Sequence, residues 1–104
     1  MIKIENIFAD APKNIDGEFV KRVSLSKDIT VEGIISSESN VRSEIYDQNE
    51  WEFVVLFEGY AKLEFEDGNQ VEMRKGDYIH IPPHSKHRIL KTDKDTKWLC
   101  MFYK

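Results

Sequence analysis

Short runs in which apolar and polar residues alternate, separated by turn residues about every ten positions, make up most of this chain. The clearest run covers residues 60–66, where Ala61, Leu63 and Phe65 share one side and charged residues take the other. The turn predicted at residues 67–69 (Asp-Gly-Asn) is a hairpin turn, because glycine and asparagine tolerate positive φ angles. No long segment has the apolar period of about 3.6 residues that marks a helix. The sequence therefore predicts an all-β fold, either a sandwich or a barrel.

Residues 51–58 differ from the other predicted strands because both of their faces are apolar. One face carries Phe53, Val55 and Phe57. The other carries Glu52, Val54 and Leu56. A strand of this kind is usually covered on both sides. One face is expected to look into the barrel, and the other to meet a second layer or a second subunit. We therefore expect a homodimer.

Length, charge and cysteine content limit the classes of protein to consider. The 104 residues suffice for one domain, in which residues 1–17 are expected to form an arm and a loop. A net charge of −4, with acids and bases well mixed, argues against nucleic acid or a membrane as partner. The longest apolar run, residues 53–57, is too short to span a bilayer, and no signal-peptide core is evident. Cys100 is the only cysteine, which fits a reducing compartment, so we expect a cytoplasmic protein.

Two spaced motifs lie within residues 41–90. In the first, Glu52 is followed by six residues and then Gly59. In the second, Gly76 is followed by five residues, then Pro82, and His87 comes five positions later. In this spacing the chain resembles a small single-domain cupin. The resemblance implies a cupin barrel, which is a double-stranded β-helix or jelly roll, with a site in its lumen.

A narrower resemblance is to a subgroup of small bacterial cupins. Its marks are a Tyr-Asp-Gln run before Glu-Trp, here residues 46–48 and 50–51, and an Ile-Pro-x-His-x-x-His segment, here residues 81–87. Cupins that hold a metal normally begin the first motif with His-x-His, three or four residues before the glutamate. With three residues between the second motif position and Glu52, the two histidine positions fall on Tyr46 and Gln48, and with four they fall on Ile45 and Asp47. Isoleucine cannot bind a metal, so we prefer the first register, with Gln48 in place of the second histidine.

The resemblance implies a candidate metal site formed by Gln48, Glu52 and His87, with His84 as a fourth ligand. These donors suit a divalent ion such as Zn, Mn, Fe or Ni, held with modest affinity. A carboxylate on an apolar strand needs a cation or a donor, so Glu52 is either a ligand or acid–base group, or a rim residue in a salt bridge. His87 is either a lumenal ligand or a histidine bonded to a backbone carbonyl.

Four further residues are candidates for contact with a small ligand at the barrel mouth: Tyr46, Asp47, Trp51 and Tyr78. His80 is expected to be structural or interfacial, and Cys100 to be a core residue rather than a nucleophile. Three functions stay open at this point. The chain is a cupin that binds a small molecule through a divalent ion, a metal-free binding or sensing module, or a structural dimeric protein with an inert lumen.

Overall fold

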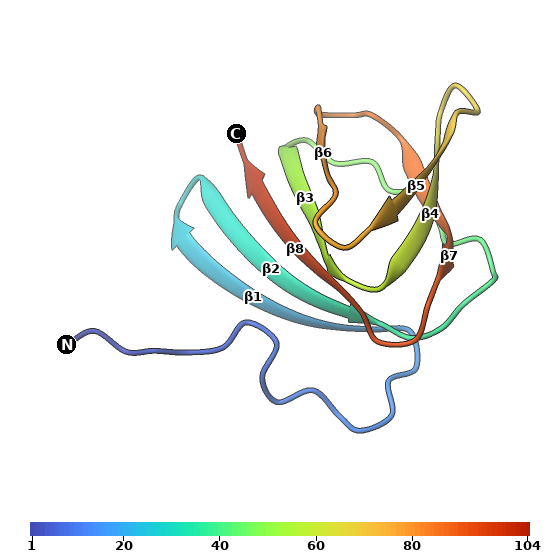
Figure 1. Cartoon of the computed structure of the whole chain (residues 1–104). Coiled ribbons are helices and arrows are strands. Elements are labelled where there is room, and N and C mark those ends of the chain that lie inside the picture. The colour runs from blue at the N-terminus through green and yellow to red at the C-terminus, as the bar shows by residue number, and fades with distance from the viewer.

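The structure, a computed structural model, describes all residues 1–104, which form eight β-strands and no helix (Figure 1). In chain order the strands are β1 (Glu18–Ser26), β2 (Ile29–Ser36), β3 (Trp51–Glu58), β4 (Tyr60–Phe65), β5 (Gln70–Arg74), β6 (Tyr78–Ile81), β7 (His87–Thr92) and β8 (Thr96–Tyr103). The predicted all-β fold is confirmed. The structure contains no helix that could span a bilayer.

The strands form two antiparallel sheets that face each other (Figure 1). One has five strands in the order β1-β2-β8-β3-β6, and the other has three in the order β5-β4-β7. The last strand, β8, pairs with β2 on one side and β3 on the other, so the end of the chain joins its early and middle parts. The two sheets enclose an interior in the manner of a jelly roll, as predicted.

The hairpin between β4 and β5 forms where the sequence predicts it. Leu63 pairs with Val71, and Ala61 pairs with Met73, so these four apolar side chains share one face. Gly68 has a φ of 85°, and the Asp67 side chain accepts a hydrogen bond from the backbone N–H of Asn69, at 2.9 Å. Local turn chemistry therefore explains where this hairpin turns.

The hydrophobic core lies between the sheets. The largest fully buried side chains, from four different strands, are Leu56, Met73, Ile81 and Thr96. Val54, Ala61, Leu63, Trp98 and Cys100 pack in the same cluster. Because both sheets contribute, neither could bury its apolar face without the other.

The five-stranded sheet has an inner face toward the core and an outer face on the opposite side. Cross-strand neighbours share a face, so the pairs Glu52–Phe102 and Val54–Cys100 are inner. The intervening pairs Trp51–Tyr103, Phe53–Met101 and Val55–Leu99 are outer. The outer face is thus as apolar as the inner one.

Residues 1–17 precede β1 and contain no strand. Ile7 crosses β2 at Gly33, where an added Cβ atom would lie 2.5 Å from the Ile7 carbonyl oxygen, so only glycine allows the crossing. Phe8 packs on Phe57 with ring centroids 5.3 Å apart. These contacts cover one end of the outer face, while the first residues of the chain leave the body (Figure 1).

Candidate functional site

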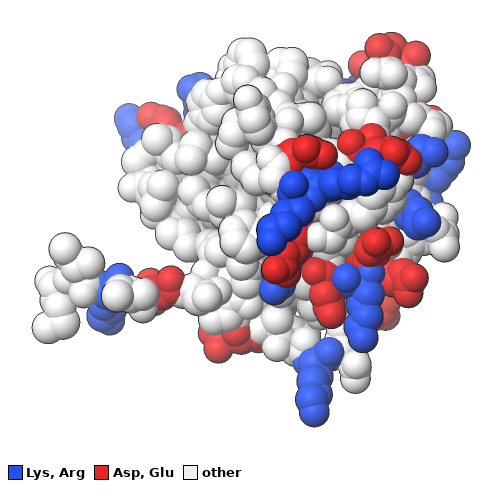
Figure 2. Space-filling view, viewed as in Figure 1, with Lys and Arg blue, Asp and Glu red and all other residues white.

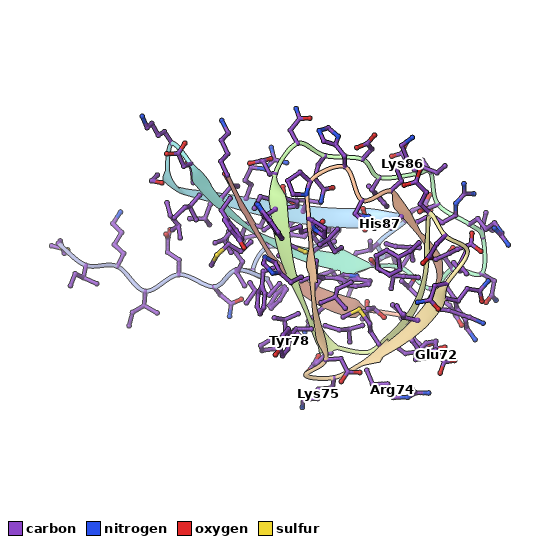
Figure 3. The ribbon with its side chains drawn as sticks, turned by 90° about the horizontal axis from the view of Figure 1, so that it is seen from above. Glu72, Arg74, Lys75, Tyr78, Lys86 and His87 are labelled. Atoms are coloured by element: carbon purple, nitrogen blue, oxygen red, sulfur yellow. The ribbon has the colours of Figure 1, made fainter.

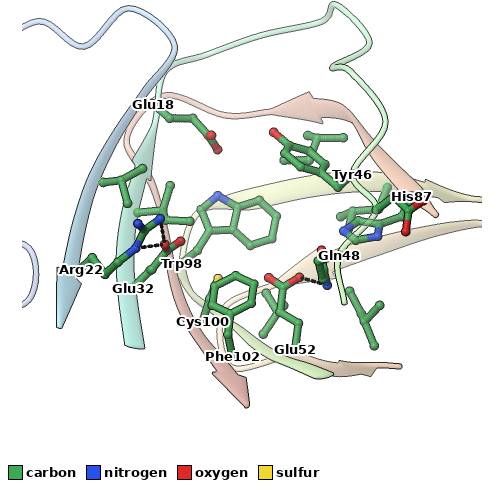
Figure 4. A pocket seen from close by; sticks show the side chains of 17 residues that line it. Glu18, Arg22, Glu32, Tyr46, Gln48, Glu52, His87, Trp98, Cys100 and Phe102 are labelled. Carbon is green, nitrogen blue, oxygen red and sulfur yellow. Dashed lines mark hydrogen bonds and ion pairs between the residues drawn. The ribbon is translucent and has the colours of Figure 1, made fainter. Parts of the chain in front are cut away.

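A cavity of about 430 Å³ lies between the two sheets (Figure 4). Ten of its 17 lining residues are hydrophobic, and the polar side chains gather at two places. We call Tyr46, Gln48, Glu52 and His87 the Glu52 group, and Glu18, Arg22 and Glu32 the Glu32 group. The indole of Trp98 lies between the two groups (Figure 4). Cavities of roughly 300–1,000 Å³ with mostly apolar walls and a few polar groups are typical of small-molecule sites.

Glu52 brings a buried carboxylate into the cavity from the inner face of β3. The residue is 8% exposed, and its Oε1 accepts a hydrogen bond of 2.9 Å from Nε2 of Gln48. Burial raises the pKa of the Glu52 carboxyl above its ordinary value, although His87 and the Gln48 hydrogen bond act in the opposite direction. The site therefore holds a carboxylate whose charge is costly and which gains from a cation or a further donor.

His87 begins β7 and presents its imidazole to the same end of the cavity. Nδ1 lies 2.9 Å from the backbone carbonyl oxygen of Ser85, which can only accept, so Nδ1 carries the proton. In the neutral ring Nε2 is then free to accept a hydrogen bond or to bind a metal. Two backbone hydrogen bonds with Tyr46 fix this position of the chain, and the two rings lie 5.6 Å apart.

The Glu32 group occupies the opposite part of the cavity. Nε of Arg22 donates to Oε2 of Glu32 at 2.7 Å, and Glu32 is only 7% exposed. Burial, with added repulsion from Glu32, raises the pKa of Glu18. None of these three residues belongs to either cupin motif. A signal for Glu32 is nevertheless present in the sequence, because Glu32, like Glu52, is a carboxylate in an otherwise apolar strand.

Two further groups in the cavity stay protonated at neutral pH. Burial raises the pKa of the Tyr46 hydroxyl, and the neighbouring Glu18 adds to the effect. Burial also raises the pKa of the Cys100 thiol, and the nearby Glu52 carboxylate acts in the same direction. Cys100 is 2% exposed and packs in the core, so it is a poor nucleophile.

The sequence matches the cupin domain family over residues 37–102, which is more than half of the chain. The chain belongs to the cupin family. A proposed mannose-6-phosphate isomerase from Ralstonia eutropha JMP134 has a crystal structure similar to this cupin, with 33% identity, a TM-score of 0.86 and 99% of each chain covered. No curated protein matches the sequence.

More distant solved structures share the fold. An RmlC-like cupin from Desulfovibrio desulfuricans is 13% identical, with a TM-score of 0.76 and coverage of 99% of this chain and 97% of that one. KdgF from a Halomonas species is 16% identical, with a TM-score of 0.74 and coverage of 88% and 83%. At these identities the likeness extends to the fold alone.

The motif glycines of this cupin occupy turns that require them. Gly59, between β3 and β4, has a φ of 98°, and a Cβ atom there would lie 2.6 Å from Oγ1 of Thr96. Gly76 has a φ of 87° in the turn between β5 and β6. Both values favour glycine. The motif spacing therefore reflects how the strands are joined as well as where Glu52 and His87 lie.

The structure places His84 outside the cavity of the cupin, away from Glu52 and His87. Its backbone has a φ of 60° and donates to the carbonyl of Gln48 at 2.8 Å, which turns the ring outward. Nδ1 of His84 instead lies 2.9 Å from Oδ1 of Asp47. The expectation that His84 is a fourth ligand is therefore not met by this geometry. Asp47 lines the cavity, but its carboxylate is paired with this exposed histidine.

Trp51 and Tyr78, which we expected at the mouth, lie on the outer face of the sheet. Trp51 packs against His80 with the rings tilted and their centroids 4.7 Å apart, and Tyr78 packs on Phe53 with centroids 5.2 Å apart. Tyr78 points outward near Lys75 (Figure 3). The reason is the two-residue period of a strand: with Glu52 directed inward, Trp51 must point outward. His80 hydrogen-bonds the hydroxyl of Tyr103 on this outer face, as suits a structural or interfacial residue.

The cupin has no group of three or more His, Cys, Asp or Glu side chains that could hold a metal ion. Glu52 and His87 are the only residues of these types in the Glu52 group, and the third donor is the amide of Gln48. The contact of Gln48 with Glu52 uses Nε2, so the amide oxygen is not needed for it. One imidazole nitrogen and two oxygen donors thus fit a divalent ion by their chemistry.

Proposed function

We propose that this cupin binds a small polar molecule in the cavity between its sheets. The observation that supports this most is the presence of a buried carboxylate, Glu52, and a histidine whose Nε2 is free at the same end of an otherwise apolar cavity. Buried polar groups of this kind cost stability unless something pairs with them. A ligand that hydrogen-bonds these groups would offset that loss of stability.

The charges of the lining residues favour an uncharged or cationic ligand. Glu18, Glu32, Asp47 and Glu52 carry the carboxylates, and Arg22 is the only lysine or arginine. Because Arg22 is already paired with Glu32, no free cation remains to receive a phosphate. The Ralstonia eutropha relative is named for a phosphorylated sugar. The carboxylates here disfavour such an anion, so we infer a ligand without a phosphate.

A divalent ion held by Gln48, Glu52 and His87 is the finer form of this proposal. Zn, Mn, Fe and Ni all accept this mixture of nitrogen and oxygen donors. Such an ion would supply Lewis-acid polarisation of a ligand oxygen. His87 would bind through Nε2 while Ser85 holds Nδ1, and Glu52 would supply the negative charge.

The second candidate is metal-free binding, favoured by the Gln48–Glu52 hydrogen bond. With Nε2 of Gln48 at 2.9 Å, Glu52 already has one partner without a metal. In this form Glu52 and Tyr46 hydrogen-bond the ligand, and Nε2 of His87 accepts a proton or a hydrogen bond. A third candidate is a structural dimer whose lumen binds nothing.

Metal analysis of protein purified without a histidine tag separates the first two candidates. We expect about one equivalent of a divalent transition ion in the wild type, and loss of it in Glu52→Gln and His87→Ala. His84→Ala is the matched control, since this histidine lies outside the cavity, and it should keep the ion. Metal that stays absent after reconstitution would leave the metal-free form.

Ligand binding is tested with three sugars that share a ring and differ in charge. We expect mannosamine and mannose to bind, and mannose 6-phosphate to bind at least about tenfold more weakly than mannose. Calorimetry or NMR titration measures the three affinities. A reversed order would overturn the inference about charge. If none of the three binds and a wider screen is also silent, the inert-lumen candidate gains support.

We further propose that the protein is a cytoplasmic homodimer that uses the outer face of the five-stranded sheet. This face exposes Trp51, Phe57, Tyr78 and Met101 to between 37% and 65%. Figure 2 shows a broad area without charged side chains on the side of β2, β3 and β8. A monomer rarely exposes so many aromatic side chains on one surface. A second copy would cover them, and the free thiol of Cys100 suits a reducing compartment.

Light scattering tests the dimer. We expect a dimeric mass at micromolar concentration for the wild type and a monomeric mass for Val55→Asp, which puts a charge in the centre of the outer face. Lys62→Asp, on the other sheet, should remain dimeric. A monomeric wild type would refute the proposal.

A further inference from the structure

The first five residues form an arm that makes no hydrogen bond with the rest of the chain. Ile2 is 97% exposed and Ile4 is 100% exposed. The chain is first tied down at Asn6, whose carbonyl accepts a hydrogen bond of 3.0 Å from Nζ of Lys21. In the space-filling view the arm projects clear of the body (Figure 2). Two large apolar side chains therefore have no surface of their own chain to cover them.

The arm has the side-chain pattern of a strand that needs an apolar surface. In an extended chain Ile2 and Ile4 point to one side, and Lys3 and Glu5 point to the other. A second copy of this chain offers such a surface, because the outer face of its five-stranded sheet is bare beyond the part that Ile7 and Phe8 cover.

The exposed apolar area of the outer face and of the arm can be compared with what a stable dimer buries. Trp51, Phe57 and Tyr78 together expose about 300 Å², taking roughly 200 Å² for each aromatic side chain. Val23 and Met101 raise the total to about 400 Å², close to the apolar share of the ~800 Å² that each partner buries in a standard interface. Two fully exposed isoleucines would add about 200 Å² from the arm.

We propose that the two copies of the dimer exchange their N-terminal arms, so that Ile2 and Ile4 of each copy pack on the outer face of the other. The inference rests on the homodimer proposed above and adds the segment that joins the two copies. The five residues before Asn6 reach about 17 Å when extended, enough to cross from one copy to the next. A two-fold axis would make the exchange reciprocal, with the same contact formed twice.

Sedimentation equilibrium with arm variants tests the exchange. The double variant Ile2→Asp and Ile4→Asp should raise the dimer dissociation constant at least tenfold, since it places four charges in the two contacts. Because the arm makes no hydrogen bond with its own body, these changes should leave the fold and its circular dichroism intact. The matched control, Lys3→Gln with Glu5→Gln, alters the opposite side of the arm and should dimerise like the wild type.

A second measurement detects the contact itself. In a dimer mixed from copies with labelled isoleucine methyl groups and unlabelled copies, we expect intermolecular NOEs from Ile2 and Ile4 to aromatic protons such as those of Trp51 or Tyr78. A wild-type dimer whose affinity is unchanged in the double aspartate variant, or that lacks these NOEs, overturns the arm exchange and leaves the homodimer standing. A monomeric wild type overturns both.

Discussion

The two faces of the five-stranded sheet reverse the usual distribution of polar and apolar residues. The inner face, which closes the barrel, carries Glu32 and Glu52 at 7% and 8% exposure. The outer face carries exposed aromatic side chains, among them Trp51 and Tyr78. The same strands supply both faces, with successive residues pointing in opposite directions. The buried carboxylates and the exposed aromatic rings are the two observations that support, respectively, the ligand and the second copy proposed above.

The other sheet shows the ordinary arrangement and serves as a reference. On β4 and β5 the outward residues are polar, and Tyr60, Glu72 and Arg74 form a hydrogen bond, a salt bridge and a cation–π contact in solvent. Glu72 and Arg74 lie at the outside of the barrel in Figure 3. One small domain therefore contains both a solvent-adapted surface and a surface that is not adapted to solvent.

The largest expected effect sharpens the contrast between adjacent residues of β3. Leu56 is fully buried, so Leu56→Ala should lower the free energy of unfolding by about 2–5 kcal/mol. Val55 is half-buried on the outer face, and Val55→Ala should cost about 1 kcal/mol. Urea unfolding of both variants at one protein concentration measures the difference. Equal costs would mean that the outer face is packed as tightly as the core.

A smaller effect is expected from the polar contacts within the interior. Nε1 of Trp98 donates to Oγ of Ser36 at 3.1 Å, and both residues are buried. Ser36→Ala leaves that N–H without an acceptor, which should cost about 1–3 kcal/mol. The exposed Ser24 provides the control, because Ser24→Ala should change stability by less than about 0.5 kcal/mol. A silent Ser36→Ala would show that water replaces the lost hydroxyl.

A pH-dependent effect tests whether the inner carboxylate costs stability. Burial raises the pKa of Glu52 in the folded state, so between the unfolded and folded pKa values the native protein binds more protons. Its stability therefore falls as the pH rises through that interval. Glu52→Gln should unfold at a higher urea concentration than the wild type at pH 8, and should lose this advantage below the unfolded pKa. The measurement is made with a chelator present.

Glu72 provides a control of opposite sign for that experiment. A hydrogen bond from the Tyr60 hydroxyl lowers the pKa of Glu72, so its ionised form contributes stability above the unfolded pKa. That contribution is lost as the pH falls through the folded pKa. Glu72→Gln should therefore be slightly destabilising at pH 8 and neutral at low pH. Parallel behaviour of the two variants would contradict the assignment of Glu52 as a costly buried acid.

Strand spacing, turn chemistry and the two cupin motifs predict the barrel and identify Glu52 and His87 as candidate site residues. They do so because alternation and glycine-dependent turns are local properties of the chain. The same alternation would have excluded Trp51 from the cavity, since it is adjacent to the inward Glu52. Parity would also have separated Tyr78 from Ile79 and Ile81. Both residues lie on the outer face because successive side chains of one strand point in opposite directions.

Patterns local to the chain predict the all-β class, the positions of the turns and the presence of Glu52, Gln48 and His87 near the two motifs. The residues that face these three side chains are set by the packing of the two sheets. Arg22 and Glu32 join the cavity through the pairing of β1 with β2, and His84 leaves it through a left-handed backbone. Pairings between residues far apart in the chain depend on how the two sheets close around a shared core, and local patterns carry no record of that closure.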